Sequence, residues 1–330
     1  MYENAVVNSI TIEGLKMQWK KTFNLLVLPF SFLVFLPKQI YAHNPEVRSD
    51  GDGNILEHYS LFELLNPLLL LALVIVYIFY LRTMNSMFKE RIIRKKFFFL
   101  MGLLTIYISL AGPIAIFSNN LILSAHMLQQ SFMYIVMPPL ILLGMPKEFF
   151  NFLDKRIFKL RFLRILKSPI LNLLLFNMLW SFYHIPQIYE YFLVHVIQLE
   201  LLHLILNTAA FLMWIQVLAP EDQINEMTYL KKIGYMFANG VLITPACALI
   251  IFSGNVIYPS ILQAPQVFAS LPPLYDQQLG GVIMKVVQEI AYGAVIGYIF
   301  FKWAKLERGI DPLIEESSNK IVIEEIGESK

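Results

Sequence analysis

The chain has 330 residues, of which 57% are hydrophobic and only 15% are charged, and its formal net charge is +2. A mean hydropathy of +0.59 excludes an ordinary soluble domain and indicates a membrane protein. The single cysteine, Cys247, excludes a disulfide framework, a zinc knuckle and any Cys-x-x-Cys redox or copper motif.

The first 42 residues predict either a secretory signal peptide or an additional membrane helix. Three lysines precede an apolar run over 22–36, and Ala42 stands directly before a polar stretch. This order is typical of a signal peptide. Cleavage after Ala42 and an uncleaved helix remain alternatives, and both place residues 43–60 outside the cell as a polar segment.

Seven long apolar segments follow. A hydrocarbon core about 30 Å thick requires roughly 20 apolar residues per helix. The segments that meet this requirement are 61–81, 97–117, 121–145, 170–188, 193–218, 233–254 and 279–303. We therefore expect an all-α integral membrane protein with a seven-helix bundle over residues 61–305, besides the signal peptide or eighth helix. The Glu-rich segment 306–330 is expected to form a cytoplasmic tail.

Basic residues determine the expected orientation. Lys and Arg are concentrated in the loops after the first, third and seventh segments and before the sixth, whereas 118–120, 188–192 and 255–278 contain none. The positive-inside rule places the basic loops in the cytoplasm. The external end should then hold His126, His184 and His195, with His203 slightly deeper.

A stripe of polar and sulfur-bearing side chains follows the start of the third segment. Residues three, four, seven and eleven apart share one helix face, and His126, Gln129, Gln130, Met133 and Met137 have this spacing. Imidazole and thioether groups are suitable ligands for Cu(I), and imidazole also binds Cu(II), zinc and haem iron. The alternative is a packed helix interface with hydrogen-bonded polar groups and methionines that fill gaps.

The fifth segment carries a second polar face. Glu200 and His203 are three residues apart, but His195 lies about 12 Å from His203 along the helix axis, so these two histidines cannot ligate one ion directly. We expect His203 to pair across the bundle with His126 or His184, with Glu200 orienting its ring. A His–Glu pair that only locks helix packing is the alternative.

The sixth and seventh segments contain further groups that are unusual in a membrane. Lys285 and Glu289 are four residues apart, so they can neutralise each other near the middle of the bilayer. They either form a structural ion pair buried in the bundle or tune a site. Cys247 lies beside Pro245 and serves either packing or metal binding.

Several ordered motifs resemble those of the CtaG family, assembly factors of caa3-type cytochrome c oxidase. The resemblance covers about residues 61–308. It rests on Ser124-Ala125-His126-Met127-Leu128-Gln129, Pro138-Pro139, Leu143-Gly144-Met145-Pro146, Tyr183-His184-Ile185-Pro186, Thr244-Pro245-Ala246-Cys247-Ala248 and Asp276-Gln277-Gln278-Leu279-Gly280-Gly281, with Met284-Lys285 and Gln288-Glu289 beyond. It implies a multi-pass protein of the bacterial plasma membrane that assists oxidase formation without being a subunit.

Copper supply to the oxidase is the function that the resemblance and the residues together favour. The expected partners are subunits of the caa3-type oxidase or other copper-handling assembly factors. No phosphate-binding glycine loop, nucleophile elbow or His-Glu-x-x-His motif is present, so we expect no enzymatic activity. The candidate metal ligands are His126, His184, His203, His195, Met127, Met133 and Cys247, and the groups expected to tune or gate the site are Glu200, Asp276, Lys285 and Glu289.

Two other functions remain open at this point. Histidines on neighbouring helices are what bis-imidazole haem ligation requires, so a membrane cytochrome or haem carrier is one alternative. A metal transporter is the other, for which the stripe from His126 to Met137 would form a path.

Overall fold

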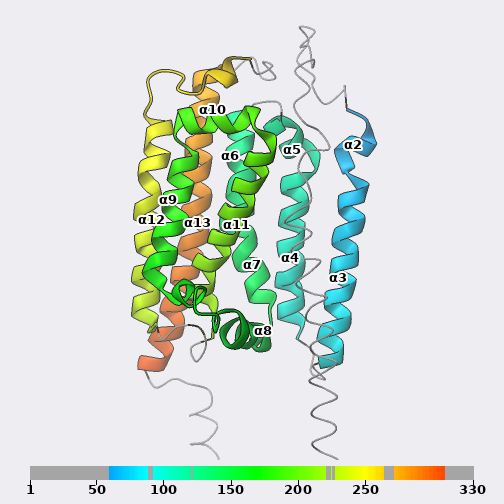
Figure 1. Cartoon of the computed structure of the whole chain (residues 1–330), viewed down its shortest axis with the longest axis vertical. Helices are drawn as coiled ribbons and strands as arrows, with labels where there is room; N and C mark the ends of the chain where they lie inside the picture. The colour runs from blue at the N-terminus through cyan, green and yellow to red at the C-terminus, as the bar shows by residue number, and fades with distance from the viewer. Residues whose placement is uncertain are drawn as a thin grey trace, which may run out of the picture.

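The protein is a bundle of long helices that run along a common direction (Figure 1). The computed structural model describes residues 59–308, except for 88–91, 120–121, 221–223, 225–226 and 264–270. Within these ranges there are helices and no strand, which confirms the expected all-α class. The expected signal peptide or additional helix, the external segment 43–60 and the tail 306–330 lie almost entirely outside the described residues.

The helices of the bundle follow one another in chain order. The first half contains α2 (Leu61–Leu65), α3 (Pro67–Met87), α4 (Ile93–Leu110), α5 (Gly112–Asn119), α6 (Leu123–Ser131), the π-helical turn η3 (Phe132–Val136) and α7 (Met137–Gly144). The second half contains α9 (Pro169–Tyr183), α10 (Pro186–Val194), α11 (Val196–Leu218), α12 (Tyr229–Ile251) and α13 (Pro273–Glu307). Short helical pieces, α8 (Lys147–Phe152), η4 (Leu153–Ile157), η5 (Arg164–Lys167) and η6 (Pro259–Gln263), lie in the connections.

Several of these helices are suited to cross a membrane. Five stretches among the described residues are long and apolar enough, namely Leu61–Ser86, Leu123–Gly144, Val196–Leu218, Tyr229–Ile251 and Pro273–Glu307. The bent pair of α4 and α5 would add a sixth. The protein is therefore a helical membrane protein, as its composition predicts.

The segment expected as the fourth span, 170–188, is not one continuous helix. α9 has 15 residues and ends at Tyr183. Ile185 adopts an extended conformation because a following proline disfavours the helical region, and Pro186 then begins α10. α10 lies across the end of the bundle (Figure 1). The expected count of seven spans thus stays a prediction, with α9 as the short candidate.

The bend between α4 and α5 has a local cause. The two helices meet at an angle of 42°. Ala111 ends α4 in an extended conformation, and Gly112 has a φ of +70°, a value that side chains other than glycine rarely tolerate. The bend brings Ser118, near the end of α5, towards α6.

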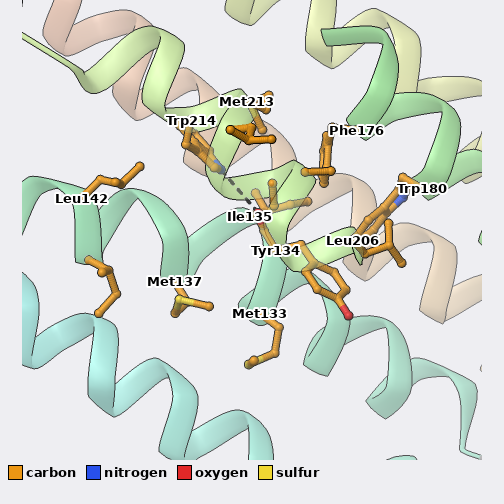
Figure 2. Packing of buried hydrophobic residues seen from close by; sticks show 14 of the residues in the cluster. Met133, Tyr134, Ile135, Met137, Leu142, Phe176, Trp180, Leu206, Met213 and Trp214 are labelled. Atoms are coloured by element: carbon orange, nitrogen blue, oxygen red, sulfur yellow. Dashed lines mark hydrogen bonds between the residues drawn. The ribbon is translucent and has the colours of Figure 1, made fainter. Parts of the chain in front are cut away.

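The long span Leu123–Gly144 contains a π turn next to two prolines. The N–H groups that would reach the Tyr134 carbonyl in an α- or π-helical pattern belong to positions 138 and 139, and both are prolines. The indole of Trp214 on α11 donates to this carbonyl at 3.4 Å instead (Figure 2). Because a π turn takes an additional residue, the helix phase changes within the expected stripe from His126 to Met137.

The core is closely packed where α4 meets α7. A Cβ at Gly144 would lie 2.7 Å from Cβ of Phe99 and 2.9 Å from its Cα, so only glycine fits. Tyr80 stacks on Phe99 with ring centroids 3.9 Å apart and donates to the Gly144 carbonyl at 2.7 Å. Large buried side chains fill the remaining centre, including Phe176, Trp180, Leu206 and Met213 (Figure 2).

Candidate functional site

Three histidines from different helices surround one tyrosine at the end of the bundle that is expected to be external. Tyr183, the last residue of α9, is 1% exposed. Its ring centroid lies 6.1 Å from that of His126 on α6, 5.2 Å from that of His184 and 5.6 Å from that of His203 on α11. The structure therefore gathers these three imidazoles around Tyr183.

A chain of hydrogen bonds assigns the tautomer of His126. Gln129 donates its amide N–H to the Ser109 carbonyl at 2.7 Å, and its Oε1 accepts the Ser118 hydroxyl proton at 3.0 Å. Because the single Ser118 hydroxyl proton is donated to Gln129, Ser118 Oγ can only accept from His126 Nδ1, which lies 3.3 Å away. This leaves a lone pair on His126 Nε2, which accepts from the Tyr183 hydroxyl at 3.1 Å.

His184 offers a ring nitrogen with no partner. Its Nδ1 donates to the Trp180 carbonyl at 2.7 Å, which fixes the ring and leaves the lone pair on Nε2. Nε2 is buried and has no hydrogen-bond partner, while the whole residue is 1% exposed. The Tyr258 hydroxyl donates to the His184 carbonyl at 2.6 Å, so the backbone at the end of α9 is held as well.

His203 is oriented by a second tyrosine. The Tyr134 hydroxyl lies 2.7 Å from His203 Nδ1, and the two rings stack. Tyr134 comes from the π turn in the span Leu123–Gly144. Glu200, one turn before His203 on α11, lies near enough to interact electrostatically with Tyr134 and Tyr183. The structure places Tyr134 and Tyr183 against His203, and its expected pairing with His126 or His184 stays a prediction.

Aromatic residues from α10 and the 255–263 segment cover the site. Tyr189 lies 5.5 Å from His126 and 5.0 Å from Tyr258 between ring centroids. Burial raises the pKa of both Tyr189 and Tyr258 above the usual range, so both hydroxyls stay protonated. Glu190 accepts from the Ser260 backbone at 3.0 Å and so ties α10 to the segment that carries Tyr258.

Asp276 positions the helix that carries His126. One carboxylate oxygen accepts from the backbone N–H of Leu123 at 2.6 Å, and the other from that of Ser124 at 3.1 Å. The Ser124 hydroxyl donates to the same carboxylate. An acidic group at a helix N-terminus satisfies its unpaired N–H groups and interacts favourably with its dipole. Asp276, on α13, therefore caps α6 and fixes it against α13.

The remaining candidate ligands are dispersed. His195 is half-buried and stacks on Tyr191 at 4.2 Å, with its Nδ1 bonded to the Tyr191 carbonyl. Met127 is fully buried and lies 3.1 Å from where a Cβ of Gly280 would be. Cys247 is buried on α12, where it interacts with Lys285 of α13.

The ion pair expected on α13 is present. Lys285 Nζ lies 2.6 Å from Glu289 Oε1, but the Glu289 side chain is 60% exposed. Of the two alternatives, a structural pair buried in the bundle does not fit Glu289, and a role in tuning a site stays a prediction. Lys285 also donates to Thr244 on α12 at 2.9 Å, which places the pair beside α12.

The geometry of the histidines bears on metal binding. In the part of the chain that the structure describes, no group of three or more His, Cys, Asp or Glu side chains is arranged to hold a metal ion. The Tyr183 ring stands between the three imidazoles. His126 Nε2 accepts from the Tyr183 hydroxyl, and the buried His184 Nε2 has no hydrogen-bond partner, so both ring nitrogens carry their lone pair.

Sequence reasoning missed the tyrosines of this site. Tyr183 directly precedes His184 in the sequence. The spacing of residues on one helix, however, does not show which side chains of other helices they contact. Tyr134 lies 69 positions from His203 and Tyr258 lies 74 positions from His184, so only the fold brings them to His203 and to the His184 carbonyl.

The fold and the site define a multi-pass helical membrane protein with a buried His–Tyr cluster at one end of its bundle. Residues 65–306 match the family described as cytochrome c oxidase caa3 assembly factor (Caa3_CtaG). This match covers most of the chain, so the chain belongs to that family, as its motifs predict. No curated protein and no solved structure matches it.

Proposed function

We propose that the protein supports assembly of caa3-type cytochrome c oxidase by binding copper at His126, His184 and His203 and passing it to an oxidase subunit or another copper-handling factor. In this proposal copper is cargo and not a resident cofactor. Imidazole ligands without a thiolate hold Cu(I) in an exchangeable way. The absence of a catalytic motif from the sequence supports an assembly role without enzymatic activity.

The unpartnered Nε2 of His184 carries the proposal. A buried polar atom without a hydrogen bond costs free energy, about 1–3 kcal/mol, so its retention calls for a ligand. Metal-binding histidines commonly donate their other ring N–H to a backbone carbonyl, and His184 Nδ1 does so to Trp180 at 2.7 Å. The ring is thus held in the orientation in which a metal would meet it.

Tyr183 supports an exchangeable site. Its hydroxyl occupies His126 Nε2 at 3.1 Å, and its ring separates the three imidazoles. Copper would replace the hydroxyl at His126 and require a small rotation of the ring. When copper leaves, the hydroxyl returns to the imidazole, so the empty site keeps a hydrogen-bonded partner.

The proposal includes a topology in the bacterial plasma membrane. Seven spans, with α9 as the short one, would place α10 and the His–Tyr cluster at the external side and residues beyond Arg308 in the cytoplasm. The loops rich in Lys and Arg support this orientation. Copper would then be collected and released on the external side.

Copper content of single variants tests the function. His126→Ala, His184→Ala and His203→Ala should each lower both the copper bound per protein and the oxidase activity, with little change in abundance. His195→Ala is the matched control, because that histidine lies on Tyr191 away from the cluster. If all three variants bind copper as the parent does, the proposal fails. A haem band in the visible spectrum of the purified protein would show that the site binds haem instead of copper.

A further inference from the structure

The chain between η4 and α9 exposes apolar side chains at the end of the bundle opposite the His–Tyr cluster. It leads into Pro169, the first residue of α9, whereas Tyr183 is the last residue of that helix. Leu160, Phe162 and Ile165 are 49%, 73% and 62% exposed. These three large apolar side chains form a surface for which water is a poor environment.

The outward direction of the three side chains is fixed by the fold. Phe158 is buried in the core, and Leu163 and Leu166 pack against it. The Leu166 carbonyl also accepts from the Asn172 side chain of α9 at 2.7 Å. One side of the segment is therefore docked on the bundle, and the exposed apolar side chains belong to its other side.

Basic side chains alternate with the exposed apolar ones. Five of them are exposed, namely Lys155, Arg156, Lys159, Arg161 and Arg164. The sequence has no acidic residue in 155–189, and within the described ranges none of the five has an ion-pair or side-chain hydrogen-bond partner. Other lysines at this end are bound by the chain itself, since Lys95 donates to the Met145 carbonyl at 2.7 Å and Lys167 pairs with Asp154. The five positive charges thus remain for a negatively charged partner.

The bilayer lies close to this segment. α9 has 15 residues, about 22 Å of helix, and is shorter than a hydrocarbon core of about 30 Å. α3 and α13 reach at least as far as α8 at this end of the bundle (Figure 1). With α9 as a span, the residues before Pro169 therefore lie at the boundary between hydrocarbon and headgroups and not in bulk water.

We propose that this patch, the five basic residues together with Leu160, Phe162 and Ile165, binds anionic phospholipids of the surrounding bilayer. The ammonium and guanidinium groups bind headgroup phosphates, and the apolar side chains enter the adjoining acyl region. Each basic residue near an anionic membrane surface strengthens the attraction. The proposal does not depend on copper binding.

A bilayer fits the patch better than the acidic segment that the chain itself supplies. Segment 309–330 carries six acidic residues, so it has the charge to neutralise the same basic groups. Docking it, however, would cost the conformational entropy of ordering a further length of chain. Phosphates and hydrocarbon already lie side by side in the bilayer next to α9, so lipid meets both kinds of side chain without that cost.

Quenching by brominated lipids tests the patch. Full-length Phe162→Cys protein is labelled with bimane and reconstituted into phosphatidylcholine vesicles that contain an equal small fraction of brominated phosphatidylglycerol or brominated phosphatidylcholine. The anionic lipid should quench about fivefold more effectively, and Ile165→Cys is a second reporter with the same expectation. Leu262→Cys, an exposed position in η6, should show no preference. Equal quenching by the two lipids at both reporters, or none by either, overturns the proposal.

Charge variants locate the preference in the patch. In the Phe162→Cys protein, Arg161→Gln with Arg164→Gln should remove most of the preference for phosphatidylglycerol, whereas Arg161→Lys with Arg164→Lys should keep it. Arg82→Gln with Arg94→Gln is the matched control, because both arginines are exposed at the same end and the loss of net charge is equal. A preference that falls equally in the two Gln pairs would show a general surface potential and overturn the proposal.

Neutralising the acidic segment distinguishes the two occupants. Replacing Glu315, Glu316, Glu324 and Glu325 by Gln in the full-length Phe162→Cys protein should leave quenching by both lipids unchanged. A label that neither lipid quenches in the parent background, but that both quench after these substitutions, would show that segment 309–330 covers the patch. That result would overturn the proposal.

Discussion

The hydroxyl of Tyr183 lies 3.1 Å from Nε2 of His126, the ring nitrogen that the surrounding hydrogen bonds leave as an acceptor. The same tyrosine ring contacts the rings of His184 and His203. One phenol therefore stands between all three proposed copper ligands. Removing the Tyr183 hydroxyl therefore tests whether it binds copper itself or competes with copper for His126 Nε2.

Tyr183→Phe should bind Cu(I) more tightly than the parent. The substitution removes the hydroxyl that competes for His126 Nε2, and a hydrogen bond of about 1 kcal/mol corresponds to roughly a fivefold change in Kd. The measurement is a competition titration with a chromophoric Cu(I) chelator. Tyr191→Phe, at the half-buried His195, is the control and should leave Kd unchanged. Weaker binding by Tyr183→Phe would mean that the phenol itself helps to hold the metal.

Asp276→Asn should lower the thermal stability of the purified protein. The carboxylate accepts two backbone N–H groups at the start of α6, and loss of a charged cap costs about 1–2 kcal/mol. Because α6 carries His126, copper binding should weaken as well. Asp154→Asn is a suitable control, since its ion pair with Lys167 is partly exposed and a pair of that kind contributes about 0–1 kcal/mol. Equal Tm values for the two variants would contradict the capping role.

The helical membrane class was predictable because span length and loop charge are local properties of a sequence. The expected segments 61–81, 193–218 and 233–254 correspond to α3, α11 and α12. The bend at Gly112 and the end of α9 before Pro186 were harder to predict from the sequence. The fold decides whether such a residue bends, ends or only kinks a helix.

The proximity of the three histidines was predictable, but the hydrogen bonds around them were not. His126, His184 and His203 were expected at the same end of different helices, and they lie around Tyr183. Their role as metal ligands stays a prediction. The stripe from His126 to Met137 assumed a uniform helix, and the π turn at Phe132–Val136 breaks that assumption. Spacing also could not show that Asp276, about 150 positions away in sequence, caps α6.

Thiol labelling should report opposite sides for two loop positions. Asn255→Cys is expected to react with a membrane-impermeant maleimide in intact cells, whereas Arg308→Cys should react only after the membrane is opened. Both residues are exposed, and the native Cys247, at 1% exposure, serves as the unlabelled background. The physical reason is the cost of moving Lys-rich and Arg-rich loops across the membrane during insertion. Labelling of Arg308→Cys in intact cells would reverse the proposed topology.

Trp214→Phe should destabilise the protein through the carbonyl of Tyr134. Pro138 and Pro139 cannot donate to that oxygen, and the Trp214 indole N–H does so from α11 at 3.4 Å. Phenylalanine keeps most of the ring but leaves the buried carbonyl unpaired, at an expected cost of about 1–3 kcal/mol. Unfolding in denaturant measures the loss, with Trp303→Phe as the control, because the Trp303 indole bonds the exposed carboxylate of Glu307. Since Tyr134 also orients His203, Trp214→Phe should in addition lower copper affinity, which Trp303→Phe should not do. A Trp214→Phe protein as stable as the parent would show that the π turn needs no donor from α11.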